Sequence, residues 1–135
     1  MDISEQTAKE LLAVAAEIRN RAHAPYSGFS VGAGLLTEDG SVVPGCNVEN
    51  SSYSLTCCAE RTAIFTAVTA GFRAFRAIAI VADGKPVPPC GACRQVLSEF
   101  APDLPIILSD ENGQPRILSL TNLLPEPFTA EYLNR

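Results

Sequence analysis

Apolar residues recur at helical spacing near the start of the chain. Between Ser4 and about Ala22 they fall every three to four positions, with most charged residues on the opposite face. This pattern predicts an amphipathic helix with Ser4 as its N-cap. The segment Ala24–Gly28, which contains proline and glycine, is expected to end the helix.

The residues after this break are typical of two strands joined by a tight turn. Phe29–Thr37 and Ser41–Asn47 are the predicted strands, and Glu38-Asp39-Gly40 is the predicted turn. A short glycine-containing turn between two such segments predicts a β-hairpin. Cys46, near the end of the second strand, is expected to be a buried small residue.

The rest of the chain predicts two more helices and three more strands. A helix ended by Gly71 is expected at Cys57–Gly71, and the following elements are expected at Phe75–Ala82 (strand), Gly91–Phe100 (helix), Pro105–Ser109 (strand) and Arg116–Leu120 (strand). The link 110–114 is too short for a crossover helix, so the last two strands should be antiparallel. The order of elements predicts an α/β fold in three layers, a mixed five-stranded sheet with helices on both faces.

Composition narrows the class of protein. The chain has 135 residues, 47% of them hydrophobic and 19% charged, which predicts one globular domain over residues 1–135. A net charge of −5 opposes binding to nucleic acid or to an anionic membrane surface. No apolar run approaches the roughly 20 residues of a membrane span, and the first residues do not resemble a signal peptide. We therefore expect a cytoplasmic protein.

Five cysteines in a reducing compartment suggest metal or redox chemistry rather than disulfides. Cys58-Ala59-Glu60 lies at the predicted start of one helix, and Pro89-Cys90-Gly91-Ala92-Cys93 lies at the start of the next. A catalytic zinc ion takes three protein ligands and keeps its fourth position open for water. Three cysteines at two helix starts therefore predict one zinc ion per chain.

The charge of such a site predicts further roles. Three thiolates outweigh the charge of Zn²⁺, and the N–H groups at helix N-termini offset the excess and lower thiol pKa values. Arg61 and Gln95 are candidates to bond the sulfurs from outside the metal shell. Glu60 is the candidate acid/base, because a carboxylate two residues from a zinc ligand is placed to move protons.

Cysteine and glutamate in this arrangement are typical of zinc-dependent nucleobase deaminases. Further motifs are Ala24-Pro25-Tyr26-Ser27, Phe29-x-Val31-Gly32-Ala33, Gly45-Cys46-Asn47-x-Glu49-Asn50, Cys58-Ala-Glu-Arg-Thr-Ala63 and Pro89-Cys-Gly-x-Cys-Arg-Gln95. With these motifs the chain closely resembles the small homotetrameric cytidine deaminases, from its first helix to Phe128 near the C-terminus.

The resemblance implies an activity and an assembly. The activity is hydrolytic deamination of cytidine and 2′-deoxycytidine with release of ammonia, a step of pyrimidine salvage. Water activated by zinc attacks C4 of the base, and Glu60 transfers its proton to ring N3 and then assists the leaving amine. In this family the first zinc-binding cysteine directly precedes Ala-Glu, which favours Cys58 over Cys57 as the zinc ligand. The assembly is a homotetramer with shared active sites, in which Phe128 packs against the base bound by a neighbouring subunit.

The resemblance also implies the remaining substrate contacts. The Ala59 N–H binds the carbonyl of the base, and the Pro88 carbonyl receives the leaving amine. Phe29 packs against the base. Asn47 and Glu49, which share one face of an extended segment, bind the ribose hydroxyls.

Other functions fit parts of the pattern. A thiol oxidoreductase would use Cys90 and Cys93 as a dithiol but leaves Cys58 and Glu60 without a role. A non-catalytic zinc module needs a fourth ligand, and the single histidine, His23, is expected to be a surface or packing residue. A polynucleotide deaminase needs a basic face. An amino-nucleoside antibiotic deaminase is the closest enzymatic rival, against which the Asn-x-Glu-Asn segment favours an ordinary ribose.

Overall fold

A five-stranded mixed sheet lies between helices in the computed structural model of the chain, which describes residues 3–83 and 85–133. The elements are α1 (Glu5–Ile18), β1 (Gly32–Thr37), β2 (Val42–Cys46), α2 (Ala59–Thr69), β3 (Phe75–Val81), α3 (Gly91–Phe100), β4 (Pro105–Ser109), β5 (Pro115–Ser119) and α4 (Leu120–Leu123). Three short 3-10 turns lie at Arg19–Arg21, Tyr53–Leu55 and Ala130–Leu133. Residues 1–2, 84 and 134–135 of the predicted domain lie outside the described residues. Within that described part, no helix is both long and apolar enough to cross a membrane.

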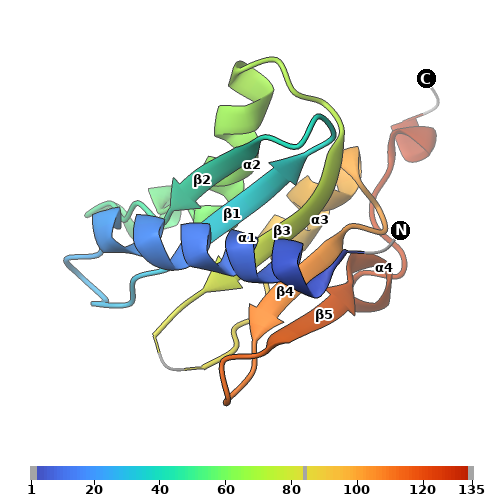
Figure 1. Cartoon of the computed structure of the whole chain (residues 1–135). Helices are drawn as coiled ribbons and strands as arrows, with labels where there is room; N and C mark the ends of the chain where they lie inside the picture. The colour runs from blue at the N-terminus through green and yellow to red at the C-terminus, as the bar shows by residue number, and fades with distance from the viewer. Residues whose placement is uncertain (1–2, 84, 134–135) are drawn as a thin grey trace.

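The strands follow the order β2-β1-β3-β4-β5. β3 and β4 are parallel and are connected through α3, and every other neighbouring pair is antiparallel. In Figure 1, α1 lies in front of the sheet, and α2 and α3 lie behind it. The predicted three-layer α/β fold is therefore confirmed, including the antiparallel last pair, in which Pro105 lies opposite Ser119.

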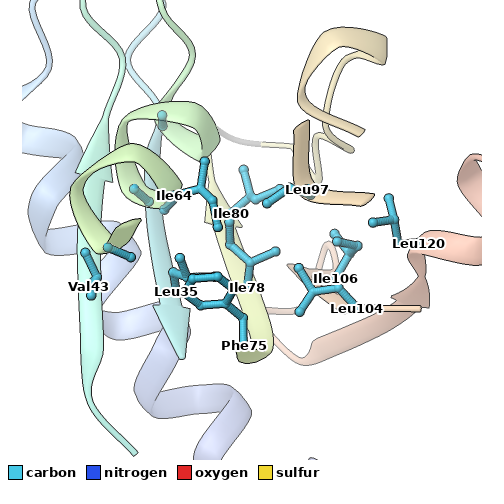
Figure 2. Close-up of a cluster of buried hydrophobic side chains, with 14 of the residues drawn as sticks. Leu35, Val43, Ile64, Phe75, Ile78, Ile80, Leu97, Leu104, Ile106 and Leu120 are labelled. Atoms are coloured by element: carbon cyan, nitrogen blue, oxygen red, sulfur yellow. The ribbon is translucent and has the colours of Figure 1, made fainter. Parts of the chain in front are cut away.

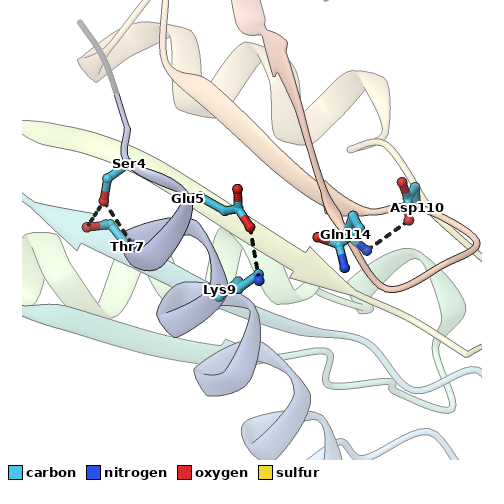
Figure 3. A network of polar contacts seen from close by, with 6 residues as sticks. All are labelled: Ser4, Glu5, Thr7, Lys9, Asp110 and Gln114. Carbon is cyan, nitrogen blue, oxygen red and sulfur yellow. Dashed lines mark hydrogen bonds and ion pairs between the residues drawn. The ribbon is translucent and has the colours of Figure 1, made fainter.

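Two polar contacts in Figure 3 agree with the local sequence pattern. The Ser4 hydroxyl accepts a hydrogen bond from the Thr7 N–H at 3.1 Å, which confirms the predicted N-cap of α1. The Asp110 carboxylate accepts from the Gln114 N–H at 2.8 Å and closes the turn between β4 and β5. This tight turn explains why the two strands are antiparallel neighbours.

The first helix is shorter than its periodicity predicts. α1 ends at Ile18, whereas the pattern predicted a helix to about Ala22. Its last buried residue is Ala15, and the 3-10 turn that follows at Arg19–Arg21 buries no side chain, so little packing favours continuation of the α-helix. The Arg19 Nε–H then donates to the Ser30 carbonyl at 2.8 Å and joins the end of the helix to the segment before β1.

The first strand also starts later than predicted. β1 begins at Gly32, not at Phe29. The Asn47 amide donates to the Phe29 carbonyl and accepts from the Val31 N–H, each at 2.8 Å. These main-chain groups are therefore bound to a side chain and are not part of a β ladder, which the strand pattern did not reveal.

The larger core lies between the sheet and the pair α2 and α3. Figure 2 shows sheet residues such as Leu35, Ile78 and Ile106 grouped with Ile64 of α2 and Leu97 of α3. Each fully buried Leu or Ile side chain contributes about 1.5–3 kcal/mol relative to exposure. Because α2 and α3 pack on the same face and contact each other, this core holds the two helix starts that contain the cysteines in one region.

Candidate active site

The start of α2 lies very close to strand β2. A Cβ atom added to Gly45 would be 2.5 Å from the Ala63 nitrogen and 2.6 Å from the Ala59 carbonyl oxygen, so only glycine allows this approach. The Thr62 hydroxyl lies 2.8 Å from the Cys46 carbonyl and 2.9 Å from the Ala59 carbonyl. Close packing and these polar contacts set the position of the first turn of α2.

Three sulfur atoms meet where α2 and α3 begin. Cys58 is the N-cap of α2, Cys90 is the N-cap of α3, and Cys93 lies in the first turn of α3. The Cys58 and Cys90 sulfurs are 3.8 Å apart, the Cys90 and Cys93 sulfurs are 3.5 Å apart, and all three lie within 4.8 Å of one another. Sulfurs bound tetrahedrally to zinc at about 2.3 Å lie about 3.8 Å apart. The donor set and its spacing therefore fit zinc.

The electrostatics of the group favour a thiolate at Cys58. A hydrogen bond from the Cys93 thiol lowers the pKa of Cys58 to about 5, and the Arg61 guanidinium, with Nη2 at 3.4 Å from the Cys58 sulfur, acts in the same direction. The pKa of Cys93 is raised because its thiol donates to Cys58 and because it is buried. A thiolate is the form of cysteine that binds a metal ion. One of the three cysteines, Cys58, is therefore already in the form that binds a metal.

Cys57 lies outside this sulfur group, although it is adjacent in sequence to Cys58. Its main chain pairs with Val48 through two hydrogen bonds of 2.9 Å, and burial raises the pKa of its thiol. Cys46 is also outside the group and is half-buried rather than fully buried as predicted. His23, exposed in the loop after the first helix, is not part of the group either.

Glu60 lies in the first turn of α2, beside the sulfur group. Its side chain is buried, with 5% of the residue exposed. Burial, together with the negative charge of Cys58, raises the pKa of Glu60 to about 7. A carboxyl group with such a pKa both accepts and donates a proton near neutral pH, which suits an acid/base.

A cavity of about 270 Å³ opens at the two helix starts. This volume is close to the lower end of the range for small-molecule pockets. Its lining includes five of the six predicted substrate-binding residues together with the acid/base and two cysteines: Phe29, Asn47, Glu49, Ala59, Pro88, Glu60, Cys58 and Cys90. Ser27, Val31, Thr56 and Val87 complete the wall. The structure thus brings together residues that are up to 63 positions apart.

Phe128, the sixth predicted substrate-binding residue, does not line this cavity. It is 57% exposed, and its ring stacks on Tyr132 with the ring centroids 5.6 Å apart. Its side chain is therefore available to another surface.

Glu49 binds the loop at Tyr26 and Ser27, of which Ser27 also lines the cavity. One carboxylate oxygen accepts from the Tyr26 and Ser27 N–H groups at 3.0 and 3.2 Å, and the other accepts from the Ser27 hydroxyl. The Ser27 hydrogen bond lowers the pKa of Glu49, so the carboxylate is negatively charged at neutral pH. A negatively charged acceptor in the cavity suits hydroxyl groups of a ligand.

Of the two residues predicted to bond the sulfurs, the structure places only one beside them. Arg61 contacts the Cys58 sulfur, as described above. Gln95 is directed elsewhere: its amide donates to the Phe128 carbonyl at 2.8 Å and accepts from the Phe128 N–H at 3.1 Å. The prediction that Gln95 bonds a sulfur is corrected, because its amide hydrogen-bonds the main chain of the C-terminal segment.

The sequence did not indicate two hydrogen bonds that hold segments near the cavity together. Ser27 is one of the quoted motif residues, but no pattern indicated that it would bond Glu49, 22 positions away. Thr62 likewise stood in a motif without a role, and its bond to the Cys46 carbonyl connects α2 to β2 across 16 positions. Both contacts join segments far apart in sequence, which local patterns do not report.

Comparisons with known proteins agree with this geometry. Residues 5–108 match the family model described as the cytidine and deoxycytidylate deaminase zinc-binding region. A cytidine deaminase of Sporosarcina psychrophila is 49% identical over 128 residues, covering 93% of this chain and 94% of that protein. One of Halalkalibacterium halodurans is 52% identical over 126 residues, covering 92% and 96%. The crystal structure of cytidine deaminase from Burkholderia pseudomallei has a TM-score of 0.84 at 48% identity and covers 93% of this chain and 100% of that chain.

Proposed function

This chain belongs to the cytidine deaminase family, and from that premise we propose that it converts cytidine and 2′-deoxycytidine to the corresponding uridines with release of ammonia. The observation that supports this most directly is Glu60, a buried carboxyl with a pKa of about 7, in one cavity with the cysteines that are positioned to hold zinc. Cys58, Cys90 and Cys93 would hold the zinc ion, which would lower the pKa of the attacking water.

Glu60 moves the protons of the reaction in this proposal. Its carboxylate takes a proton from the attacking water and delivers it to ring N3 as the new C–O bond forms at C4. A second proton transfer through Glu60 accompanies cleavage of the C4–N4 bond, and the amine leaves as ammonia. Burial supports this role, because a carboxyl with a pKa near 7 exchanges a proton at low cost in either direction.

The base is oriented by main-chain groups and by Phe29. Ala59 is the first residue of α2, where an N–H has no acceptor within the helix, and we assign this N–H to the base carbonyl. The carbonyl of Pro88, which lines the same cavity, is assigned to the leaving amine. Phe29 is 42% exposed and lines the cavity, so its ring is available to pack on the base.

The ribose is assigned to Asn47 and Glu49. Asn47 is 7% exposed, and its two hydrogen bonds to the main chain near Phe29 hold the amide firmly at the cavity wall. The amide retains a second N–H and a second oxygen lone pair for a hydroxyl. Glu49 adds a charged acceptor.

Glu49→Gln is expected to raise KM for cytidine by about tenfold or more, because a hydrogen bond to a charged acceptor is lost. Glutamine at position 49 can still accept hydrogen bonds from the Tyr26 and Ser27 N–H groups, so this substitution should disturb the Tyr26–Ser27 loop least. Steady-state kinetics on cytidine and on free cytosine provide the measurement and its control. The response to cytosine should hardly change, and equal losses on both substrates would refute the ribose assignment.

The direct test of the activity mixes purified protein with cytidine. Loss of cytidine absorbance and release of ammonia in equal amounts are expected. A zinc-loaded protein that does neither contradicts the proposed function.

We further propose a homotetramer with shared active sites, working in the cytoplasm as one domain over residues 1–135. The exposed Phe128, which does not line the cavity of its own chain, supports a role in a neighbouring subunit. The described cysteines are all free, which supports a reducing compartment.

Phe128→Ala is expected to lower kcat/KM by about five- to 150-fold, the range of base–aromatic stacking of about 1–3 kcal/mol. Co-refolding with chains that have Glu60→Ala tests whose site Phe128 serves. In a mixed oligomer, a site that has Glu60 from a Phe128→Ala chain can receive Phe128 from a neighbouring Glu60→Ala chain. Mixed oligomers should therefore regain a measurable share of activity. If mass spectrometry confirms mixing and no activity returns, the shared site is ruled out.

A further inference from the structure

Gln95 binds a main-chain segment far away in sequence, and the proposed chemistry gives this contact no role. The side-chain amide is both donor and acceptor, and it pairs with the N–H and the carbonyl of Phe128, 33 positions later. Within residues 3–83 and 85–133, Gln95 is the sole hydrogen-bond partner of the Phe128 main chain. The Gln95 side chain thus bonds the Phe128 main chain in the way that a neighbouring strand would bond an extended segment.

Arg94, the residue before Gln95, binds the same C-terminal segment at its start. Its Nη1 donates to the Leu123 carbonyl at 3.0 Å, at the end of α4. Its Nε donates to the Pro89 carbonyl at 2.8 Å, directly before the zinc-ligand position Cys90. Both residues lie on α3 and are half-buried. Adjacent residues of α3 therefore fasten the C-terminal segment at two places.

The segment between these two anchors has little other support. Pro125 and Pro127 lack an N–H and cannot donate to a ladder. The Phe128 side chain is mostly exposed and contacts Tyr132, which is itself 67% exposed. The direction in which the Phe128 ring points is therefore set largely by the orientation of its own peptide groups, which Gln95 bonds on both sides.

We propose that Gln95 is a positioning residue that orients Phe128 for contact with the substrate base, with Arg94 anchoring the start of the same segment. The proposal rests on the proposed function for the role of Phe128, but the anchoring itself is a property of this chain alone. Gln95 acts through the C-terminal segment, not through the sulfurs.

Gln95→Met tests the proposal, because methionine has a similar length and shape and forms neither hydrogen bond. Hydrogen exchange should become faster at the Phe128 amide, and KM for cytidine should rise about three- to tenfold with kcat little changed. In a Phe128→Ala background the same substitution should have no further effect on KM. Glu99→Met, at an exposed position one turn later on α3, is the matched control and should change neither quantity.

Four outcomes would overturn the proposal in whole or in part. Unchanged exchange at Phe128 refutes the anchoring, whether or not the protein deaminates cytidine. An equal rise in KM with and without the Phe128 ring shows that Gln95 acts elsewhere, as does a loss of zinc from Gln95→Met. A parent protein without activity on cytidine contradicts the proposed function and with it the role in catalysis, whereas faster exchange in the variant would still establish the anchoring.

Discussion

Glu60→Gln is expected to fold and to retain zinc while its turnover number falls by more than about 100-fold, the lower end of what general acid–base catalysis contributes. Glutamine has nearly the shape of a protonated glutamate, and Glu60 is buried with a pKa of about 7, so the neutral side chain fits the site. An amide cannot take up and release the proton. Single-turnover and steady-state rates on cytidine, together with zinc content, measure the effect.

Glu99→Gln on the surface of α3 makes the same chemical change away from the cavity and should leave turnover unchanged. Substrate binding should survive in Glu60→Gln, because the proposed contacts to base and ribose come from other residues. Turnover within about tenfold of the parent, a change of only about 1.4 kcal/mol in the barrier, would show that Glu60 is not the acid/base.

Cys58→Ala is expected to lose the zinc ion and essentially all activity. The parent should contain about one zinc per chain, because the sulfurs are already spaced for a tetrahedral ion. Removing one thiolate leaves two ligands, and the Arg61 guanidinium loses its sulfur partner. Elemental analysis after gel filtration measures the metal, and the deamination assay measures the activity.

The adjacent Cys57 provides a matched control. Its sulfur lies outside the group, so Cys57→Ala should keep both zinc and activity. A metal-free chain that is fully active would contradict the zinc mechanism. Metal loss from Cys57→Ala with retention in Cys58→Ala would reverse the ligand assignment.

Local sequence patterns predicted most of the fold because they reflect local physics. α3 and β4 have the predicted bounds, Ser4 caps α1, and Gly71, with φ of 102°, follows the end of α2 as expected. The errors occur where a distant residue intervenes. β1 starts late because Asn47 binds the main chain near Phe29, and no periodicity in residues 29–37 reports a side chain 16 or 18 positions later.

The chemistry of the candidate site could likewise be predicted from short motifs. The residues that supply sulfur and the buried carboxylate lie within two segments, 58–60 and 90–93, each at the start of a helix. Helix starts provide unpaired N–H groups whatever the remainder of the fold. The choice between Cys57 and Cys58 depended on a family resemblance, and the sulfur positions agree with that choice.

Hydrophobic spacing and short motifs express forces that act over a few residues. They were enough to predict the strands, the longer helices, their order and the residue types of a zinc deaminase, but not the short helix α4, whose first residue Leu120 was predicted in the last strand. The partners that the long-range polar side chains find depend on how the whole chain packs. Gln95 was expected at a sulfur and instead binds Phe128, and Glu49 binds Ser27. A side-chain amide or carboxylate hydrogen-bonds whichever group the packed core brings within about 3 Å, and that neighbour depends on how α2, α3 and the sheet pack together.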